Sequence, residues 1–249
     1  MVWGTATVDR HLLDVWTPAS PAESRGVLIF LPGYEGVSPA ADFSWTAHLQ
    51  HNSLTMVVVR AKECCWTPQT ETAFDTRYSP LEFVSSGLLP WIGEQFPGQP
   101  TAISGVELGG QGALQLAYRK AREFPIVAAI SPKVDFETWH GHGLSLDRLY
   151  EDAEAARQET AILHLHPLAW PRYQLILCDA EDLYARDGVG TLLSKLASTG
   201  IPHEHEVTTT QGGFGWQYAA ASAEKVIAFV LTSWADQATR VAEESARGG

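Results

Sequence analysis

The chain has 249 residues, 45% of them hydrophobic and 18% charged, which is enough apolar material for one sizeable α/β domain or two small ones. Its formal net charge is −12 and its 17 Lys and Arg residues form no basic run. We therefore exclude nucleic-acid and anionic-membrane surfaces, because phosphate binding needs a cationic patch. No basic segment followed by an apolar core stands at the N-terminus, and no apolar run approaches the roughly 20 residues that span a bilayer, so we expect neither a signal peptide nor a membrane helix.

The first half of the chain alternates apolar runs with helix-like segments. Residues 3–18 predict an antiparallel hairpin and residues 79–96 a helix that starts at a Ser-Pro pair. Strands are expected over 25–33, 53–61 and 100–105, and further helices over 40–51 and 109–121. Such a βαβα order requires a mostly parallel sheet with helices on both faces.

The second half continues this order. Strands are expected over 124–132, 172–180 and 203–210, and helices over 189–200, closed by Gly200, and over 216–234. Residues 134–171 form an irregular insertion with a short acidic helix, and we expect it to roof a pocket at the carboxyl edge of the sheet. The polar residues 237–249 are expected to form a frayed tail.

A glycine-bracketed turn follows the strand that ends near residue 105. Gly105 and Gly109 flank Glu107 at a spacing of two residues, while Gly110 and Gly112 would let the next helix pack close to the sheet. A strand, a strained turn and a helix in this order expose the side chain at the tip. The alternative is a glycine-rich helix start with Glu107 favourably placed near a helix N-terminus.

Here the chain resembles the bacterial esterases of the esterase D and S-formylglutathione hydrolase type, within the α/β-hydrolase superfamily. The resemblance implies one α/β-hydrolase domain over residues 1–249. In that family the turn has the pattern G-x-S-x-G-G, the acid follows a late strand, and the histidine lies in G-G-H-x-W. The segments that carry the resemblance are LPGYEG, CCWTP, SPLEFVSSGLLPWI, GGQGALQLAY, FPIVAAISP, HLHPLAWPR, CDAEDLY and GGFGWQY.

Two of the three triad positions that the resemblance implies carry other residues. The nucleophile position falls on Glu107, the histidine position on Phe214, and the acid position on Asp182, with Asp179 as the less favoured choice. A serine needs a positioned base to take its proton, and phenylalanine cannot do so. Ser104 belongs to the strand, so we do not expect it to replace the nucleophile. The resemblance therefore implies the fold but not ordinary serine hydrolysis.

Glu107 itself could act in three ways. It could attack the substrate directly, although the resulting ester would need an activated water for its release. It could act as an acid/base with Asp182 as its carboxylate neighbour, and the backbone N–H groups of Leu108 and Tyr34 would then stabilise an oxyanion. Lys133 is expected to line the pocket, where it could pair with Glu107; the alternative, which we favour over this ion pair, is a solvated loop lysine. The third way is binding without catalysis, in a pocket lined by Trp66, Phe214 and Trp216.

Metal and thiol chemistry have weaker support. The histidine pairs at 140/142, 164/166 and 203/205 lack a third ligand nearby, so we predict no metal site. No phosphate loop or dinucleotide fingerprint is present, and no cofactor is implied. Cys64, Cys65 and Cys178 form no disulfide framework, which favours reduced, structural thiols and a cytoplasmic setting over a reactive thiol.

Our first hypothesis is an esterase-derived enzyme that performs non-serine acid/base chemistry on a small-molecule substrate, with Glu107 and Asp182 as its catalytic groups. The chemistry would be elimination, isomerisation, cyclisation or hydration. The first alternative is a catalytically inactive relative that binds a ligand or a partner protein, and the second is a residual carboxylesterase. A homodimer remains an open alternative.

Overall fold

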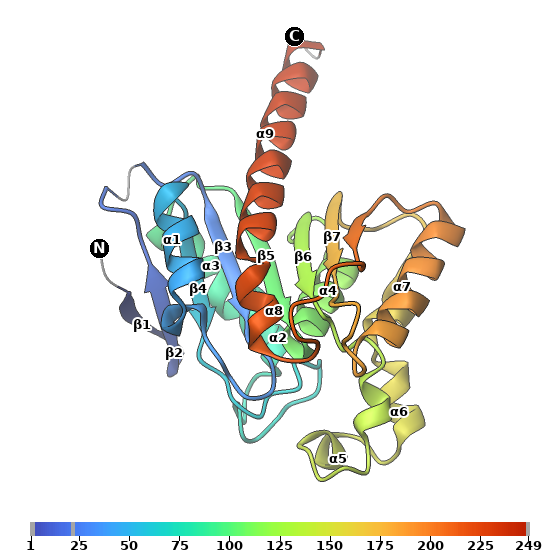
Figure 1. The fold of residues 1–249 in the computed structure, drawn as a ribbon. Helices are drawn as coiled ribbons and strands as arrows, with labels where there is room; N and C mark the ends of the chain where they lie inside the picture. Colours follow the sequence, from blue (N-terminus) through green and yellow to red (C-terminus); the bar gives the residue numbers. More distant parts are fainter. Residues whose placement is uncertain (1–2, 21–22, 248–249) are drawn as a thin grey trace.

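The computed structural model describes residues 3–20 and 23–247, and its strands form one mixed sheet (Figure 1). In the described chain the sheet has eight strands in the order β1-β2-β4-β3-β5-β6-β7-β8. β1 and β2 pair antiparallel, as do β2 and β4, and the other neighbours are parallel. The fold class is therefore α/β, as predicted. The strands are β1 Gly4–Val8, β2 His11–Trp16, β3 Val27–Leu31, β4 Thr55–Val59, β5 Thr101–Val106, β6 Ile126–Ile130, β7 Tyr173–Leu177 and β8 Glu204–Glu206.

The central strands are buried on both faces because helices cover the sheet from two sides. Every residue of β3, β4 and β6 is buried, which explains why their sequences are continuous apolar runs without alternation. Side chains of neighbouring residues still point to opposite faces: Ile29 and Leu31 join one core cluster, whereas Leu28 and Phe30 join the other.

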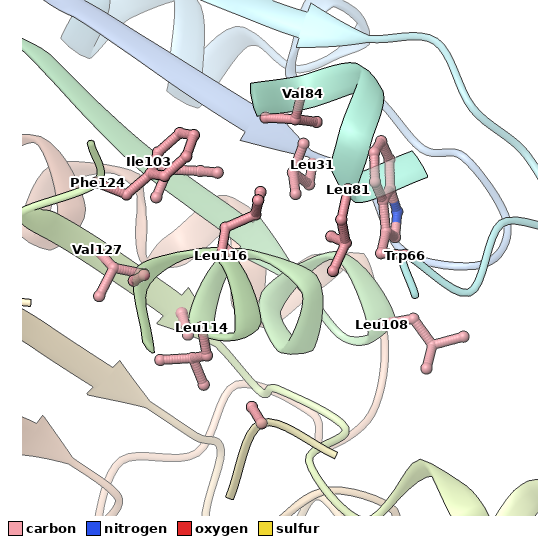
Figure 2. Close-up of a cluster of buried hydrophobic side chains, with 14 of the residues drawn as sticks. Leu31, Trp66, Leu81, Val84, Ile103, Leu108, Leu114, Leu116, Phe124 and Val127 are labelled. Carbon is pink, nitrogen blue, oxygen red and sulfur yellow. The ribbon is translucent and has the colours of Figure 1, made fainter. Parts of the chain in front are cut away.

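Three helices cover one face of the sheet: α1 Phe43–His51, α8 Trp216–Ala221 and α9 Ala223–Arg247. The other face is covered by the π-helical turn η3 Phe83–Leu88 with α3 Leu89–Gln95, by α4 Leu108–Arg119 and by α7 Arg186–Thr199. Figure 2 shows the core on this second face, with Leu114 and Leu116 of α4 near Val127 and Ile103. The shorter elements are η2 Pro39–Ala41, α2 Pro80–Glu82, η4 Phe136–Trp139, α5 Leu146–Leu149, α6 Ala153–Gln158 and η5 Ala161–His164.

The helix ends that were predicted from capping residues are present. The Ser79 hydroxyl accepts a hydrogen bond from the Glu82 amide at 3.1 Å, and Pro80 begins α2. Gly200 closes α7 in the left-handed region, with φ of 67°. Both caps are local features, which is why the sequence predicted them correctly.

The C-terminal segment differs from the prediction. Residues 237–247 continue α9 as a helix where a frayed tail was expected, and residues 248–249 lie outside the described residues. Side chains one turn apart support this extension, as in the Arg240–Glu244 ion pair at 3.4 Å. Within the described part of the chain, no helix combines the length and the apolarity that crossing a bilayer requires.

Candidate active site

The turn between β5 and α4 holds Glu107 in a backbone conformation that residues other than glycine rarely adopt, with φ of 56° and ψ of −120°. Three hydrogen bonds of 3.0 Å stabilise it. The Glu107 amide donates to the Ile130 carbonyl, and the Glu107 carbonyl accepts from the amides of Lys133 and Gln111. Strain of this kind persists where the surroundings over-determine it, and it concentrates at functional sites.

The glycines around Glu107 are required by close backbone contacts. A Cβ atom on Gly105 would lie 2.4 Å from the Gly109 carbonyl oxygen, and one on Gly109 would lie 2.1 Å from the Leu31 carbonyl oxygen. No other residue fits either position. The turn is therefore the strained strand-to-helix turn that the spacing predicted, and the alternative of a merely glycine-rich helix start is wrong.

The Glu107 carboxyl group lies against the loop that follows β3. Its Oε1 atom accepts a hydrogen bond from the Tyr34 amide at 3.4 Å, and a Cβ atom on Gly33 would lie 2.7 Å from its Oε2 atom. Burial raises the pKa of Glu107 to about 7, and the charges of Glu35 and Asp182 act in the same direction. The Tyr34 amide and Lys133 oppose the shift only in part. Both protonation states of Glu107 are therefore populated at neutral pH.

The two candidate acids after β7 have different surroundings. Asp182 is fully buried; its Oδ1 atom accepts from the amides of Tyr184 and Ala185 at 2.9 and 3.0 Å, while its Oδ2 atom has no hydrogen-bond partner. Asp179 instead accepts from the amides of Gln211 and Gly213 and so holds the loop that carries residue 214. Asp182 shares a pocket with Glu107, and Asp179 supports the loop beside that pocket.

The pocket is a small cavity of about 110 Å³ at the carboxyl edge of the sheet. Ligand pockets for drug-sized molecules measure roughly 300–1,000 Å³, so this one suits a small group. Its lining comes from the loops after β3, β5, β6, β7 and β8, as expected for an open α/β sheet. The lining residues are Gly33, Glu35, Gly36, Val37, Val106, Glu107, Ser131, Asp182, Phe214, Gly215 and Trp216.

Two polar lining residues were missed by the sequence analysis. Ser131 directly follows β6 with φ of 41°, and Glu35 lies on the loop after β3 next to Tyr34. Both residues follow the carboxyl end of a parallel strand, and such ends meet at one edge of the sheet. This position could have predicted that they line the pocket. Leu108, the other predicted oxyanion donor, begins α4, so its N–H is one of the four that no carbonyl within that helix accepts.

The structure places two of the three predicted aromatic lining residues at the pocket and the third in the core. Phe214 is half-exposed on the pocket wall, and Trp216 lines the pocket while its indole N–H donates to Asp42 at 2.8 Å. Trp66 is fully buried in the core, near Leu81 (Figure 2), and its indole N–H donates to the Pro32 carbonyl at 2.8 Å. Trp66 therefore supports the loop after β3 from below and does not line the pocket.

Lys133 follows neither of its predicted roles. Its side chain is buried, and its ammonium group donates to Asp135 at 2.8 Å and to the Tyr184 carbonyl at 2.7 Å. It also lies 5.3 Å from the centre of the Trp139 ring. Lys133 is therefore neither a solvated loop lysine nor the ion-pair partner of Glu107, and it does not line the pocket.

The insertion at residues 134–171 was expected to roof the pocket, but it does not contribute to the lining of the cavity. Its short helices join the core cluster that contains Ile29 and Leu31, and the Ser145 amide donates to the Tyr34 hydroxyl at 3.1 Å. The insertion thus supports the loop of Tyr34 from outside the pocket.

The cysteines and the histidine pairs lie away from the pocket lining. All three thiols are free and buried, burial raises the pKa of Cys65 to about 12, and the Cys65 sulfur lies 3.1 Å from the Ser145 hydroxyl oxygen. The rings of His203 and His205 stack 5.4 Å apart. Among the described residues, no group of three or more His, Cys, Asp or Glu side chains could hold a metal ion.

Solved structures of esterases share this architecture. A ferulic acid esterase superposes with a TM-score of 0.73 at 16% identity, covering 93% of this chain and 97% of its own. An S-formylglutathione hydrolase from Agrobacterium tumefaciens gives 0.69 at 16% identity, with 93% and 99% covered, and one from Staphylococcus aureus gives 0.71 at 13%, with 93% and 100% covered. At such identities the likeness shows the fold alone, which is that of the α/β-hydrolases.

No curated protein matches the chain at the level of sequence. A family model does: the family described as "Putative esterase" matches residues 19–182, which is more than half of the chain and includes both Glu107 and Asp182. This match and the strand-to-helix turn together place the chain among the esterase-type α/β-hydrolase proteins. The protein belongs to that esterase family.

Proposed function

We propose that this protein transfers protons on a small substrate, with Glu107 as the acid/base group, and does not hydrolyse esters through a serine at the turn. The observation that supports it best is the position of Glu107. A carboxyl group with a pKa of about 7 stands at the tip of the strained turn, inside the pocket and beside a second carboxylate. A catalytic group is most efficient when its pKa lies near the working pH.

In the proposed reaction, the ionised Glu107 carboxylate takes a proton from a carbon next to a substrate carbonyl. The electron pair moves to the carbonyl oxygen, and the amides of Tyr34 and Leu108 are the donors available to that oxyanion. Tyr34 donates to Glu107 in the structure, so its N–H must leave the Glu107 carboxyl group in order to stabilise the oxyanion. Return of the proton to a neighbouring atom gives isomerisation, and loss of a leaving group gives elimination.

Two other functions each have an observation in their favour. The hydrogen bond between Tyr34 and Glu107 occupies an oxyanion donor, which favours a protein that binds a ligand without turning it over. Membership of an esterase family favours residual ester hydrolysis, and Ser131 is a serine among the residues that line the pocket with Glu107. Phe214 can accept no proton at the position where the resemblance implies histidine.

The test compares the wild type with Glu107→Gln, Ser131→Ala and the double variant Glu107→Ser/Phe214→His on short-chain p-nitrophenyl esters and on small carbonyl compounds that exchange an α-proton with solvent. We expect an inert wild type on esters, α-proton exchange that Glu107→Gln abolishes and Ser131→Ala retains, and ester hydrolysis by the double variant. Wild-type ester hydrolysis that is lost in Ser131→Ala would refute the proposal in favour of a serine esterase. Binding without any exchange would favour the non-catalytic alternative.

A further inference from the structure

The pocket carries an unbalanced set of charges. Three acidic residues line it, namely Glu35, Glu107 and Asp182, and no Lys or Arg side chain is among its described lining residues. Lys133 follows the lining residue Ser131 by two positions, but its ammonium group donates hydrogen bonds to Asp135 and to the Tyr184 carbonyl. A cavity with one sign of charge and apolar walls favours ligands of the opposite charge, because the low-polarity walls weaken screening.

One carboxylate oxygen of these acids accepts no hydrogen bond. The Oδ2 atom of Asp182, a buried residue that lines the pocket, has no hydrogen-bond partner among the described residues. The other oxygen, Oδ1, is taken by two backbone amides. Leaving a buried acceptor unpaired costs free energy, and more when the group is charged. A ligand with an N–H donor at this oxygen would recover that cost, and a cationic donor would recover the most.

The remaining walls suit an organic cation rather than a hydrated metal ion. Phe214 is half-exposed and Trp216 also lines the cavity, so two aromatic residues share this pocket with the carboxylates. Aromatic rings attract organic cations through their negative faces, and the attraction grows when the cation is desolvated. A volume of about 110 Å³ limits the group to a few non-hydrogen atoms.

We infer that this pocket binds a small organic cation with N–H donors, such as the ammonium or amidinium group of a substrate, between Asp182, Glu107 and the ring of Phe214. That the bound cation is a substrate rests on the proposed proton transfer at Glu107. That the pocket prefers a cationic ligand rests on its lining residues alone.

The experiment uses three probes of nearly equal shape, acetamidinium, acetamide and acetate, titrated into the full-length protein and followed by NMR chemical shifts. We expect acetamidinium to bind about tenfold or more tightly than acetamide, because charge-assisted hydrogen bonds are stronger than neutral ones. Acetate should not bind. Equal binding of acetamidinium and acetamide would overturn the inference.

The variants Asp182→Asn and Glu107→Gln should each lose most of the preference for acetamidinium. Asn keeps an acceptor for the amides of Tyr184 and Ala185, so the loop can remain folded, and circular dichroism checks this. Asp236→Asn, which removes one exposed negative charge on α9, is the matched control and should keep the preference. A preference that survives in Asp182→Asn but falls in Asp236→Asn would show attraction by net charge alone and refute the site.

The pH dependence gives a second readout. Acetamidinium stays cationic between pH 6 and pH 8, whereas Glu107 ionises in this range. Glu35, Asp182 and Lys133 are the charged groups that act on Glu107, and a bound cation would offset the first two. Binding should therefore tighten from pH 6 to pH 8 in the wild type and stay level in Glu107→Gln. Cation binding without proton exchange would refute only the proposed function, and exchange on neutral compounds without cation preference would refute only this inference.

Discussion

Backbone hydrogen bonds fix the conformation of Glu107, and the surroundings of its side chain raise the pKa of the carboxyl group. Its amide and carbonyl groups are fixed by Ile130, Lys133 and Gln111, so the side chain has little choice of direction. Burial then makes ionisation costly, and the Tyr34 amide offsets the cost only in part. A carboxyl group in this position couples the chemistry of the pocket to the stability of the fold.

This coupling predicts how stability changes with pH. The folded pKa of Glu107 is raised from 4.5 to about 7, so the folded chain binds more protons than the unfolded chain between these values. Its contribution to stability is therefore fully present below pH 4.5 and is lost as the pH rises through 7. Relative to Glu107→Gln, we expect the wild type to lose roughly 2–3 kcal/mol of unfolding free energy over this range.

Urea unfolding of both proteins at pH 5 and pH 8 measures the effect, and the exposed Glu204→Gln is the matched control for the loss of one charge. If the wild type and Glu107→Gln change stability in parallel with pH, then the carboxyl group is not shifted as described.

The strand-to-helix element that carries Glu107 depends on close backbone packing. α4 approaches the end of β3 so closely that Gly109 lies against the carbonyl oxygens of Leu31 and Pro32. A second close contact joins Gly112 to Trp66, where a Cβ atom would lie 2.4 Å from the Trp66 Cβ. Trp66 in turn holds the Pro32 carbonyl, so the helix, the core and the loop after β3 form one unit.

Replacing a glycine at this contact should therefore destabilise the fold far more than replacing a helical glycine whose added Cβ would meet no other atom. Gly109→Ala would place its Cβ 2.1 Å from a backbone oxygen, and we expect about 3 kcal/mol of destabilisation or more. Gly190 of α7 has no atom within 4 Å of its added Cβ, so Gly190→Ala should be neutral or stabilise by about 0.5–1 kcal/mol. Chemical unfolding checks both, and equal effects would contradict the contact.

At the scale of the whole molecule, α9 has two halves with different roles. Its first half covers one face of the sheet, and Trp234 ends this contact by packing on Gly26 and donating to the Thr101 carbonyl at 3.3 Å. Beyond Trp234 the helix projects past the sheet (Figure 1), and most of its side chains are exposed. The projecting half therefore adds little buried area.

A chain that ends at Asp236 should keep its fold and the pocket, with a change of less than about 1 kcal/mol in unfolding free energy. Trp234→Ala should cost about 3–5 kcal/mol, because it removes a large buried side chain. Thermal unfolding of both variants, together with acetamidinium binding, measures this. A truncated chain that unfolds as readily as Trp234→Ala would show that the projecting half is part of the core.

The fold was predictable because its signals are local. The apolar runs, the Ser79 and Gly200 caps, and the glycines at 105 and 109 each act within a few residues, so the mostly parallel sheet and the strained turn followed from them. The resemblance to the esterase family implied that Phe214, Trp216 and Asp182 are neighbours in the pocket, and all three line it.

What only the tertiary structure decided is which of these neighbours meet. Lys133 is paired with Asp135 rather than Glu107, Trp66 lies in the core, and no residue of the insertion at 134–171 lines the pocket. The unpaired oxygen of Asp182 and the raised pKa of Glu107 likewise arise from side chains that are distant in sequence. Burial and hydrogen bonding depend on every atom that packs around a group, and no local pattern contains that information.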